Sequence, residues 1–355
     1  MLAAGHRAVT LAAAAAARRL ASTSTPLRWE VGPGATLEIT ARSGDVTCNN
    51  GGHTEVVVSS STEPSSSLEV NPHPDSLDAR TATVIGVVSD SASVTALHPE
   101  RYCSVRALAP RGRVSVASLV EASLDARARG DVDLGSVRGV TVSASSDEGS
   151  VVCGNTSGSK VRLASASGEV SAKKVVGNAV EVNAATLVSL RSIYADAATV
   201  EGASVDLGNA GCASLVVRAA EGAKIGGITG NLRVEGGETC EVHLSRDSGV
   251  VEIVGVEREV RVTLEPGAGE VECALDAAST EMGEGASVSD CGRVLRAEGG
   301  GARPARLLDA QEGGVDAVRR ELLVSSPNAR LVVSASSWLS GFLGGRASGA
   351  EAPPR

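Results

Sequence analysis

Glycine recurs at a fixed step through the middle of this sequence, from residue 129 to about residue 245. Two series share a step of 19 residues: Gly130, Gly149 and Gly168, and then Gly139, Gly158 and Gly177. A short run of alternating apolar and polar residues follows almost every one of these glycines. Self-similarity at a fixed period of this kind is the signature of a solenoid, in which each unit buries its apolar face against the next.

The alternating runs have the period of β-strands, because apolar residues mostly stand two apart with a polar residue between them. Each run ends at Gly, Asn, Ser or Asp, which are residues that favour turns. The runs are residues 131–134, 140–142, 150–153, 161–163, 170–172, 180–182, 188–190, 205–207, 215–217 and 232–234. The sequence therefore predicts an all-β fold, a parallel β-solenoid (β-helix) with rungs of about 19 residues and two short strands in each rung.

An antiparallel sandwich of hairpins is the alternative all-β fold. Hairpins favour two-residue Asn-Gly or Asp-Gly turns, and the repeat contains neither. A sandwich also has no need for a fixed step between glycines. The glycines at constant phase indicate corners where φ is positive or where backbone layers approach closely.

The side chains available for a core are small. Aromatic residues make up 1% of the chain, so Val, Ala and Leu must fill the interior. The seven cysteines form no Cys-x-x-Cys pair, so the ligand pattern of a zinc site is missing. Three of them, Cys48, Cys153 and Cys273, stand where Val occurs in other runs, which indicates small apolar core residues that remain thiols in a reduced compartment.

Residues 1–28 have the composition of an organellar transit peptide, which is Arg-rich, Ser-rich and poor in acids. The first acid is Glu30, and the arginines are Arg7, Arg18, Arg19 and Arg28. A secretory signal would need a more apolar centre than the alanine run at residues 11–17. We expect a mitochondrial protein, with plastid targeting and secretion as the alternatives.

Three further regions are expected after this leader. Residues 29–128 form an N-terminal β region that opens the solenoid, and residues 129–335 hold the repeats, with 321–324 and 331–333 as closing strands. Residues 336–355 form a C-terminal cap and a disordered tail. Trp338 and Phe342 stand one helical turn apart, either as this cap over the last rung or as an anchor for a partner.

The charge balance argues against some classes of partner. The formal net charge is −9 and becomes more negative without the leader, whereas nucleic-acid binding needs a basic patch. No apolar run approaches the length of a transmembrane segment. We expect no nucleic acid, no transmembrane segment, no cofactor and no metal.

Catalytic motifs are missing from the sequence. There is no Gly-x-Ser-x-Gly elbow and no phosphate-binding loop of the Gly-x-x-x-x-Gly-Lys type. The best hint of catalysis is a pair of acids, Asp131 and Asp133, two apart on one strand. Paired carboxylates cleave glycosidic bonds, so the alternative to a binding protein is a carbohydrate-active β-helix enzyme that uses this face.

The order of several short motifs resembles the putative adhesin domain, a widespread domain of unknown function. These motifs are Ser-Gly-Asp/Glu-Val, as at residues 43–46 and 167–170, and the entry Val-Gly-Pro-Gly-Ala-Thr-Leu-Glu-Ile at 31–39. The leader, Ser-Ile-Tyr-Ala at 192–195 and Ser-Trp at 337–338 are most similar to its mitochondrial animal members. The resemblance covers residues 27 to 343; it implies a β-solenoid and supplies no catalytic residue.

These observations together predict a non-catalytic β-solenoid scaffold, or a protein that binds another macromolecule of unknown identity. The prediction rests on long strand faces that offer extended area without an enclosed pocket. It names no enzyme activity.

The leader can be tested by itself. Residues 1–40 fused to a fluorescent protein are expected to direct the fusion into mitochondria, because the segment is basic and acid-poor. Fluorescence microscopy with a mitochondrial marker measures this. Recovery of the fusion from the culture medium would contradict the expectation.

Overall fold

The structure is a computed structural model, and it describes residues 26–31, 33–51, 55–60, 69–72, 84–89, 93–99, 101–266, 270–284, 286–288, 294–297 and 320–336. These residues form strands and turns, with no helix among them. None of this described part could therefore cross a bilayer as a helix. The chain divides into two compact units, Met1–Ala185 and Thr186–Arg355.

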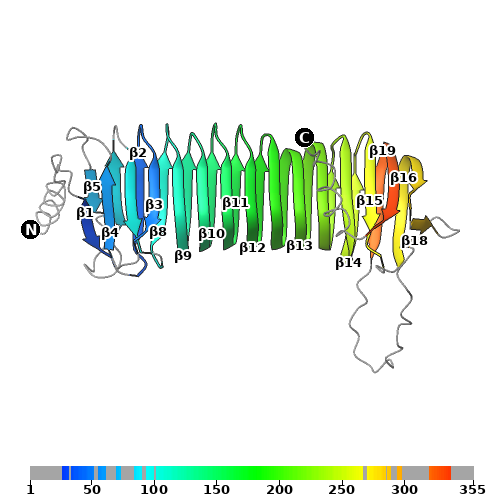
Figure 1. Cartoon of the computed structure of the whole chain (residues 1–355), viewed down its shortest axis with the longest axis horizontal. Helices are drawn as coiled ribbons and strands as arrows, with labels where there is room; N and C mark the ends of the chain where they lie inside the picture. The colour runs from blue at the N-terminus through cyan, green and yellow to red at the C-terminus, as the bar shows by residue number, and fades with distance from the viewer. Residues whose placement is uncertain are drawn as a thin grey trace, which may run out of the picture. The chain divides into compact units, whose positions relative to one another are not determined.

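The regular part of the first unit consists of four parallel strands in sequence order (Figure 1). They are β9 (Val114–Ala128), β10 (Val132–Ser146), β11 (Val151–Ser165) and β12 (Val170–Ala184). From β10 to β11 and from β11 to β12, each residue pairs with the one 19 positions further along the chain. The predicted parallel β-solenoid and its 19-residue rung are thus confirmed, and hairpins are excluded in this region.

Each rung is one bent strand of 15 residues rather than two separate short strands. In β10 the inward positions are Val132, Leu134 and Val137 before the bend and Val142 and Ala144 after it. The residues between these groups face outward, so strict alternation breaks there. In the ten predicted runs the apolar residues that stand two apart are buried, with one exception, because they form the interior from which water is excluded.

Val140 is the exception among the predicted runs. The sequence pattern groups Val140 with Val142, because the two stand two residues apart, but 60% of Val140 is exposed. The outward bend of β10 lies between the two residues, so a run of alternating residues that crosses the bend changes face.

The corner glycines allow backbone layers to approach closely. A Cβ at Gly149 would lie 2.5 Å from the amide nitrogen of Asp131, and one at Gly168 would lie 2.5 Å from the carbonyl oxygen of Gly149. Neither glycine has a positive φ. Of the two reasons predicted for these glycines, close approach is therefore the one that applies.

Buried serines fasten the same corners. The Ser165 hydroxyl donates to the Gly149 carbonyl oxygen at 2.7 Å and accepts from the Gly168 amide at 2.8 Å. Ser146 makes the equivalent pair of hydrogen bonds one rung earlier. Each serine thus joins two rungs and satisfies its own hydroxyl inside the coil.

The strands at the start of the first unit do not stack in sequence order. They are β1 (Leu27–Glu30), β2 (Thr36–Ala41), β3 (Val46–Asn50), β4 (Glu55–Ser60), β5 (Glu69–Pro72), β6 (Val84–Ser89), β7 (Val94–His98) and β8 (Ser104–Ala109). Strand β2 pairs in parallel with both β6 and β8, and β3 with both β7 and β9. The β2–β3 rung therefore lies between β6–β7 and β8–β9.

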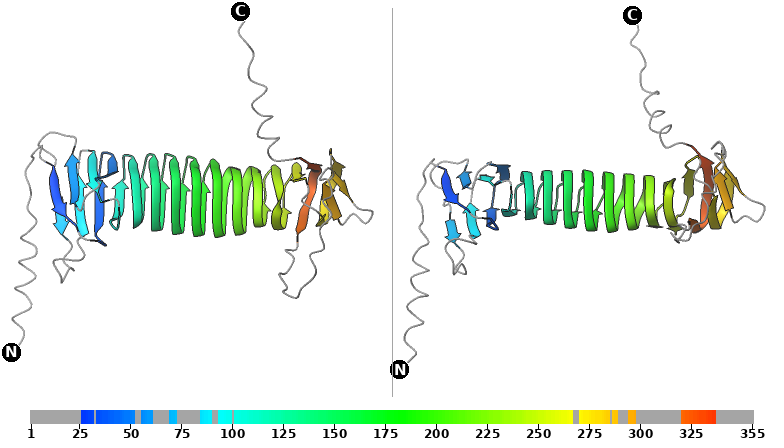
Figure 2. Two further views of the ribbon diagram at one scale, coloured as in Figure 1. Left: turned by 60° about the horizontal axis from the view of Figure 1, so that its bottom comes forward. Right: turned by 90° about the horizontal axis from the view of Figure 1, so that it is seen from below.

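Antiparallel strands cover the free edge of these rungs (Figure 2). Strand β4 pairs antiparallel with β7, β1 pairs antiparallel with β4, and β5 pairs antiparallel with β6. An uncovered parallel edge would invite further strands to add. Strand β1 begins at Leu27, so the last two residues of the predicted leader belong to this edge.

The second unit continues the same type of coil. Its strands are β13 (Leu187–Glu235), β14 (Thr239–Val254), β15 (Glu259–Leu264), β16 (Glu270–Met282), β17 (Ala286–Val288), β18 (Val294–Ala297) and β19 (Glu321–Ala335). Strands β13, β14 and β15 pair in parallel in sequence order. Inward residues from Val188 to Val234 are buried within β13, which holds several turns of the coil in one continuous strand.

The last strand that the structure describes lies inside the second unit's stack. Strand β19 pairs in parallel with β14 and β15 on one side and with β16 on the other. Residues 321–324 and 331–333 do form a strand, but it does not close the stack as expected, because β16 lies beyond it. Strand β18 then pairs antiparallel with β16 and β17.

The inward assignment can be tested with one substitution at two positions. Val142→Asp is expected to lower the free energy of unfolding by about 3–5 kcal/mol, because it buries an unpaired charge. Val140→Asp, two residues earlier and exposed, is expected to change it by no more than about 0.5 kcal/mol. Urea denaturation followed by circular dichroism measures both, and equal losses would show that the bend in β10 is misplaced.

Candidate functional site

Small aliphatic residues fill most of the inward positions of the described rungs. The side chains available for binding or catalysis are therefore mainly the outward-facing ones. In a parallel ladder, equivalent positions of neighbouring rungs lie about 4.8 Å apart and form columns. A column therefore brings together residues that are distant in the sequence. Candidate sites on this fold are columns and the hollows between them.

Asp131 lies at the corner before β10 and takes part in fastening the rungs. Its Oδ1 accepts a hydrogen bond from the Ser150 amide at 3.0 Å, and its Oδ2 lies 3.3 Å from Nε of Arg113. Asp45 makes the same type of contact, since its Oδ1 accepts from the Arg113 amide at 2.8 Å. Both carboxylate oxygens of Asp131 are thus engaged in the corner.

Asp133 faces outward from β10, two residues after Asp131. Its register neighbours are Ser115 on β9 and Val152 on β11, so no acid flanks it in its column. A further acid at the next corner, Glu148, forms an ion pair with Arg129 at 2.6 Å. The hydrogen bond from Arg129 lowers the pKa of the Glu148 carboxyl. The structure thus places Asp131 against Arg113 and Ser150, and no acid flanks Asp133 on the neighbouring rungs.

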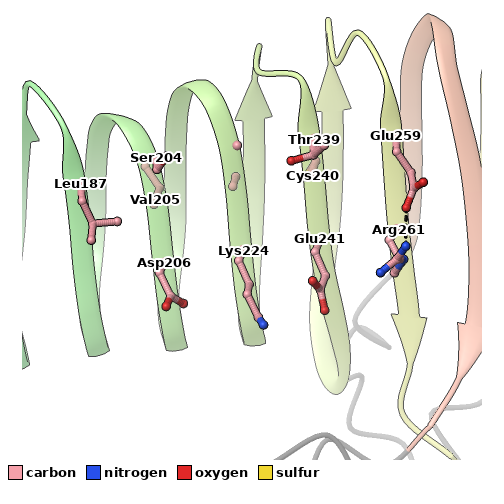
Figure 3. Close-up of a pocket in the computed structure, with 12 residues that line it drawn as sticks. Leu187, Ser204, Val205, Asp206, Lys224, Thr239, Cys240, Glu241, Glu259 and Arg261 are labelled. Atoms are coloured by element: carbon pink, nitrogen blue, oxygen red, sulfur yellow. Dashed lines mark hydrogen bonds and ion pairs between the residues drawn. The ribbon is translucent and has the colours of Figure 1, made fainter. Parts of the chain in front are cut away.

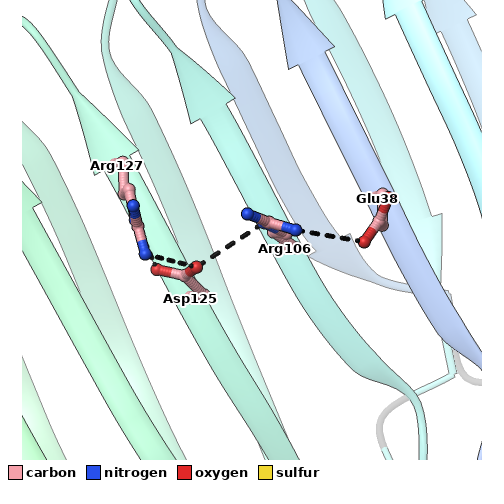
Figure 4. Close-up of polar contacts among 4 residues, drawn as sticks. All are labelled: Glu38, Arg106, Asp125 and Arg127. Carbon is pink, nitrogen blue, oxygen red and sulfur yellow. Dashed lines mark hydrogen bonds and ion pairs between the residues drawn. The ribbon is translucent and has the colours of Figure 1, made fainter.

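A column of alternating charge crosses three strands of the first unit (Figure 4). Arg106 on β8 lies 3.4 Å from Glu38 on β2 and 3.6 Å from Asp125 on β9. Asp125 also accepts from Arg127 on its own strand at 2.9 Å. Glu38 and Arg106 are 68 residues apart in sequence and meet because the β2–β3 rung is out of order.

The second unit has a comparable column. Arg233 binds Glu235 at 2.6 Å and Glu252 on the next rung at 2.7 Å, and Glu235 also binds Arg218 at 2.9 Å. Both arginines hydrogen-bond to Glu235 and lower the pKa of its carboxyl. These side chains are largely exposed, so each pair contributes at most about 1 kcal/mol to stability.

A shallow hollow of about 460 Å³ lies on another face of the second unit (Figure 3). Small residues, among them Gly222 and Ala223, form part of its lining. Charged side chains from successive rungs stand along it: Asp206, Lys224, Glu241 and Arg261.

A smaller hollow of about 210 Å³ in the second unit has Tyr194 and His243 in its wall. The Tyr194 ring lies against Gly211, where an added Cβ would come within 2.7 Å of it. Burial lowers the pKa of the His243 imidazole, against an opposing effect of the Glu265 carboxylate. His243 Nε2 is buried without a hydrogen-bond partner, so water does not reach this ring nitrogen as it would reach a general base in an open cleft.

The cysteines serve the core. Six of them are free and buried: Cys48, Cys103, Cys153, Cys212, Cys240 and Cys273. Burial raises the pKa of the Cys48, Cys153 and Cys240 thiols to about 12, which keeps them protonated and unreactive. No group of three or more His, Cys, Asp or Glu in the described residues is arranged to hold a metal ion.

The sequence predicts two site residues that the structure does not describe, and the structure contains two charged columns that the sequence analysis does not predict. Trp338 and Phe342 lie outside the described residues. Sequence reasoning missed the columns around Arg106 and Lys224, because no motif marks them. Opposite charges at matching phases of successive repeats would have indicated the second column, but not the first, whose rungs are out of sequence order.

Comparison with known proteins adds little to this description. Neither a scan of protein-family models nor a search of curated proteins gives a match. One solved structure similar to this chain is described as a putative cell adhesion protein from Clostridium sporogenes; it is 8% identical, has a TM-score of 0.16, and the match covers 88% of this chain and all of the other. A TM-score that low supports no conclusion about this chain's fold or function.

Asp131 offers a test of structural against catalytic use. Asp131→Asn is expected to change the free energy of unfolding by less than about 1 kcal/mol, because the amide oxygen still accepts from the Ser150 amide. Asn231 shows that an amide suffices, since its Oδ1 accepts from the Val250 amide at 2.9 Å. Asp131→Ala is expected to cost about 1–2 kcal/mol. Thermal unfolding measures both, and equal stability of the two variants would contradict the corner role.

Proposed function

We propose that this chain is a non-catalytic β-solenoid scaffold in mitochondria that binds another protein through charged columns on its outer faces. The column formed by Glu38, Arg106, Asp125 and Arg127 carries this proposal. It presents alternating charges at a spacing that the β-ladder fixes. A partner can match such an array without any change of shape in the scaffold.

The energetics of the column support a binding role over a purely structural one. Three of its side chains are exposed, with 58% of Arg106 and 43% of Glu38 accessible, and 27% of Asp125 is accessible. Exposed ion pairs stabilise a fold by about 0.2–1 kcal/mol each, which is small beside the burial of the aliphatic core. The same charges gain more from a partner that excludes water from them.

The alternative of a carbohydrate-active enzyme finds no favourable observation among the described residues. Asp131 is engaged by Arg113 and Ser150, and Asp133 has Ser115 and Val152 as its column neighbours. Glycosidases use two free carboxylates, one on either side of the scissile bond, whereas Asp131 is already engaged by a guanidinium and a backbone amide. We do not propose that activity for this face.

A charge swap separates binding from folding. The variant Glu38→Arg, Arg106→Glu, Asp125→Arg, Arg127→Glu keeps every pair within the column and reverses the sign presented to a partner. Its thermal midpoint is expected to match that of the natural chain. Proximity labelling in cells is expected to lose the proteins that the natural chain labels, because like charges now face each other.

Two outcomes would contradict the proposal. If the swapped variant labels the same proteins as the natural chain, this column does not bind them. If the purified protein releases reducing sugar from polysaccharides, and Asp133→Asn abolishes the release, the chain is an enzyme. A fusion that carries the labelling enzyme without the scaffold controls for chance contacts.

A further inference from the structure

The hollow on the second unit is lined by a column whose charges alternate strictly: Asp206, Lys224, Glu241 and Arg261 (Figure 3). Lys224 pairs in register with Glu241, and Glu241 with Arg261. Gly226 stacks on Gly208, and the same offset places Lys224 beside Asp206. Four successive rungs thus present negative, positive, negative and positive charge.

These charges differ from those of the other columns because three of them lack an ion pair. Arg233 and Glu252 on neighbouring rungs meet at 2.7 Å. In the described part of the chain, Asp206, Lys224 and Glu241 join no ion pair, although Lys224 and Glu241 are register neighbours; Arg261 binds Glu259 on its own strand. The charges of Asp206, Lys224 and Glu241 are therefore available to a partner.

We propose that this face binds a second copy of the same chain. A column of four alternating charges is complementary to its own reverse. A two-fold axis in the plane of contact, parallel to the strands and between Lys224 and Glu241, places Lys224 opposite the Glu241 position of the other copy. The same operation places Asp206 opposite the Arg261 position, so all four charges of each copy face an opposite charge.

The spacing of the charges favours a second copy over an unrelated protein. Successive charges stand about 4.8 Å apart because the β-ladder sets that distance. A second copy has the same ladder, so all four pairs come into register at once. Gly222 and Ala223, which also line the hollow, are small and do not obstruct the approach of a second face.

The sign pattern also selects one of two symmetric arrangements. A two-fold axis along the column would place Lys224 opposite its own copy and Glu241 opposite its own copy. Like charges in direct opposition disfavour association. The axis parallel to the strands is the arrangement that the alternation permits.

The contact is small, which sets its expected strength. Four rungs span about 14 Å at the spacing of a β-ladder, so the contact area is smaller than the roughly 800 Å² per partner of a stable complex. We expect a weak dimer in rapid exchange. It is expected to dissociate at high salt, because the Debye length falls from about 10 Å at 0.1 M to about 3 Å at 1 M.

Sedimentation velocity on the purified chain, over a concentration series at low and high salt, tests the proposal. The natural chain is expected to form a dimer at low salt that dissociates at high salt. Lys224→Glu and Glu241→Lys are each expected to weaken self-association at least about tenfold, because each reverses two pairs across the axis. Arg233→Glu, on the separately paired column, is the control and is expected to leave association unchanged.

Mixing the two reversed variants gives the decisive readout. Lys224→Glu presents two acids at the axis and Glu241→Lys presents two lysines, so an equimolar mixture is expected to restore the dimer. An effect of either substitution on folding alone would not be repaired by mixing. Thermal unfolding of each variant confirms that it is folded.

Three results would overturn the proposal. A natural chain that stays monomeric at low salt would leave this face to a different partner. A dimer that Lys224→Glu does not weaken would lie on another surface. A mixture that sediments as monomers would reject the axis between Lys224 and Glu241. None of these results bears on the column around Arg106, so the scaffold proposal stands or fails separately.

Discussion

Close stacking of one rung on the next is the constraint on which the rest of this protein depends. Parallel ladder hydrogen bonds hold neighbouring backbones about 4.8 Å apart, and at corners such as Gly149 the approach leaves no space for a Cβ. The buried Ser165 hydroxyl then links two corners that would otherwise leave polar groups unsatisfied. A narrow coil closed in this way has room only for Val, Ala, Leu, Ile and Cys, which explains why aromatic residues are so scarce.

The same stacking determines what the outer surface can present. Because inward positions repeat, outward positions repeat as well, and charges at equivalent phases become columns. Where long side chains of opposite sign meet, as Arg233 and Glu252 do, they neutralise each other across rungs. Where they do not meet, as along Lys224 and Glu241, the ladder presents an uncompensated pattern. The backbone thus sets the spacing of a binding surface, and only the signs are left to the side chains.

The sequence contains enough to predict the regular part of this fold and less of its ends. A 19-residue step and period-two alternation predict both the register of β10 to β12 and inward residues such as Val170, because both are local consequences of the repeat. The repeat does not predict the exposure of Val140, because alternation alone does not indicate the bend that separates it from Val142. The positions of the β2–β3 rung and of β19 depend on pairings between distant segments, which no local pattern records.

The stacking of rungs also distinguishes the candidate catalytic residue Asp131 from the candidate binding residue Lys224. The sequence makes Asp131 a catalytic candidate because it stands two residues from another acid. In the structure its oxygens accept a hydrogen bond from the Ser150 amide and form an ion pair with the Arg113 guanidinium. These contacts give Asp131 a structural role at the corner, in which it joins one rung to the next. The sequence does not indicate a role for Lys224, because a single lysine on a strand forms no motif. Its meaning comes from the sign of its neighbours one rung away, so surface function on a solenoid must be sought along columns rather than along the chain.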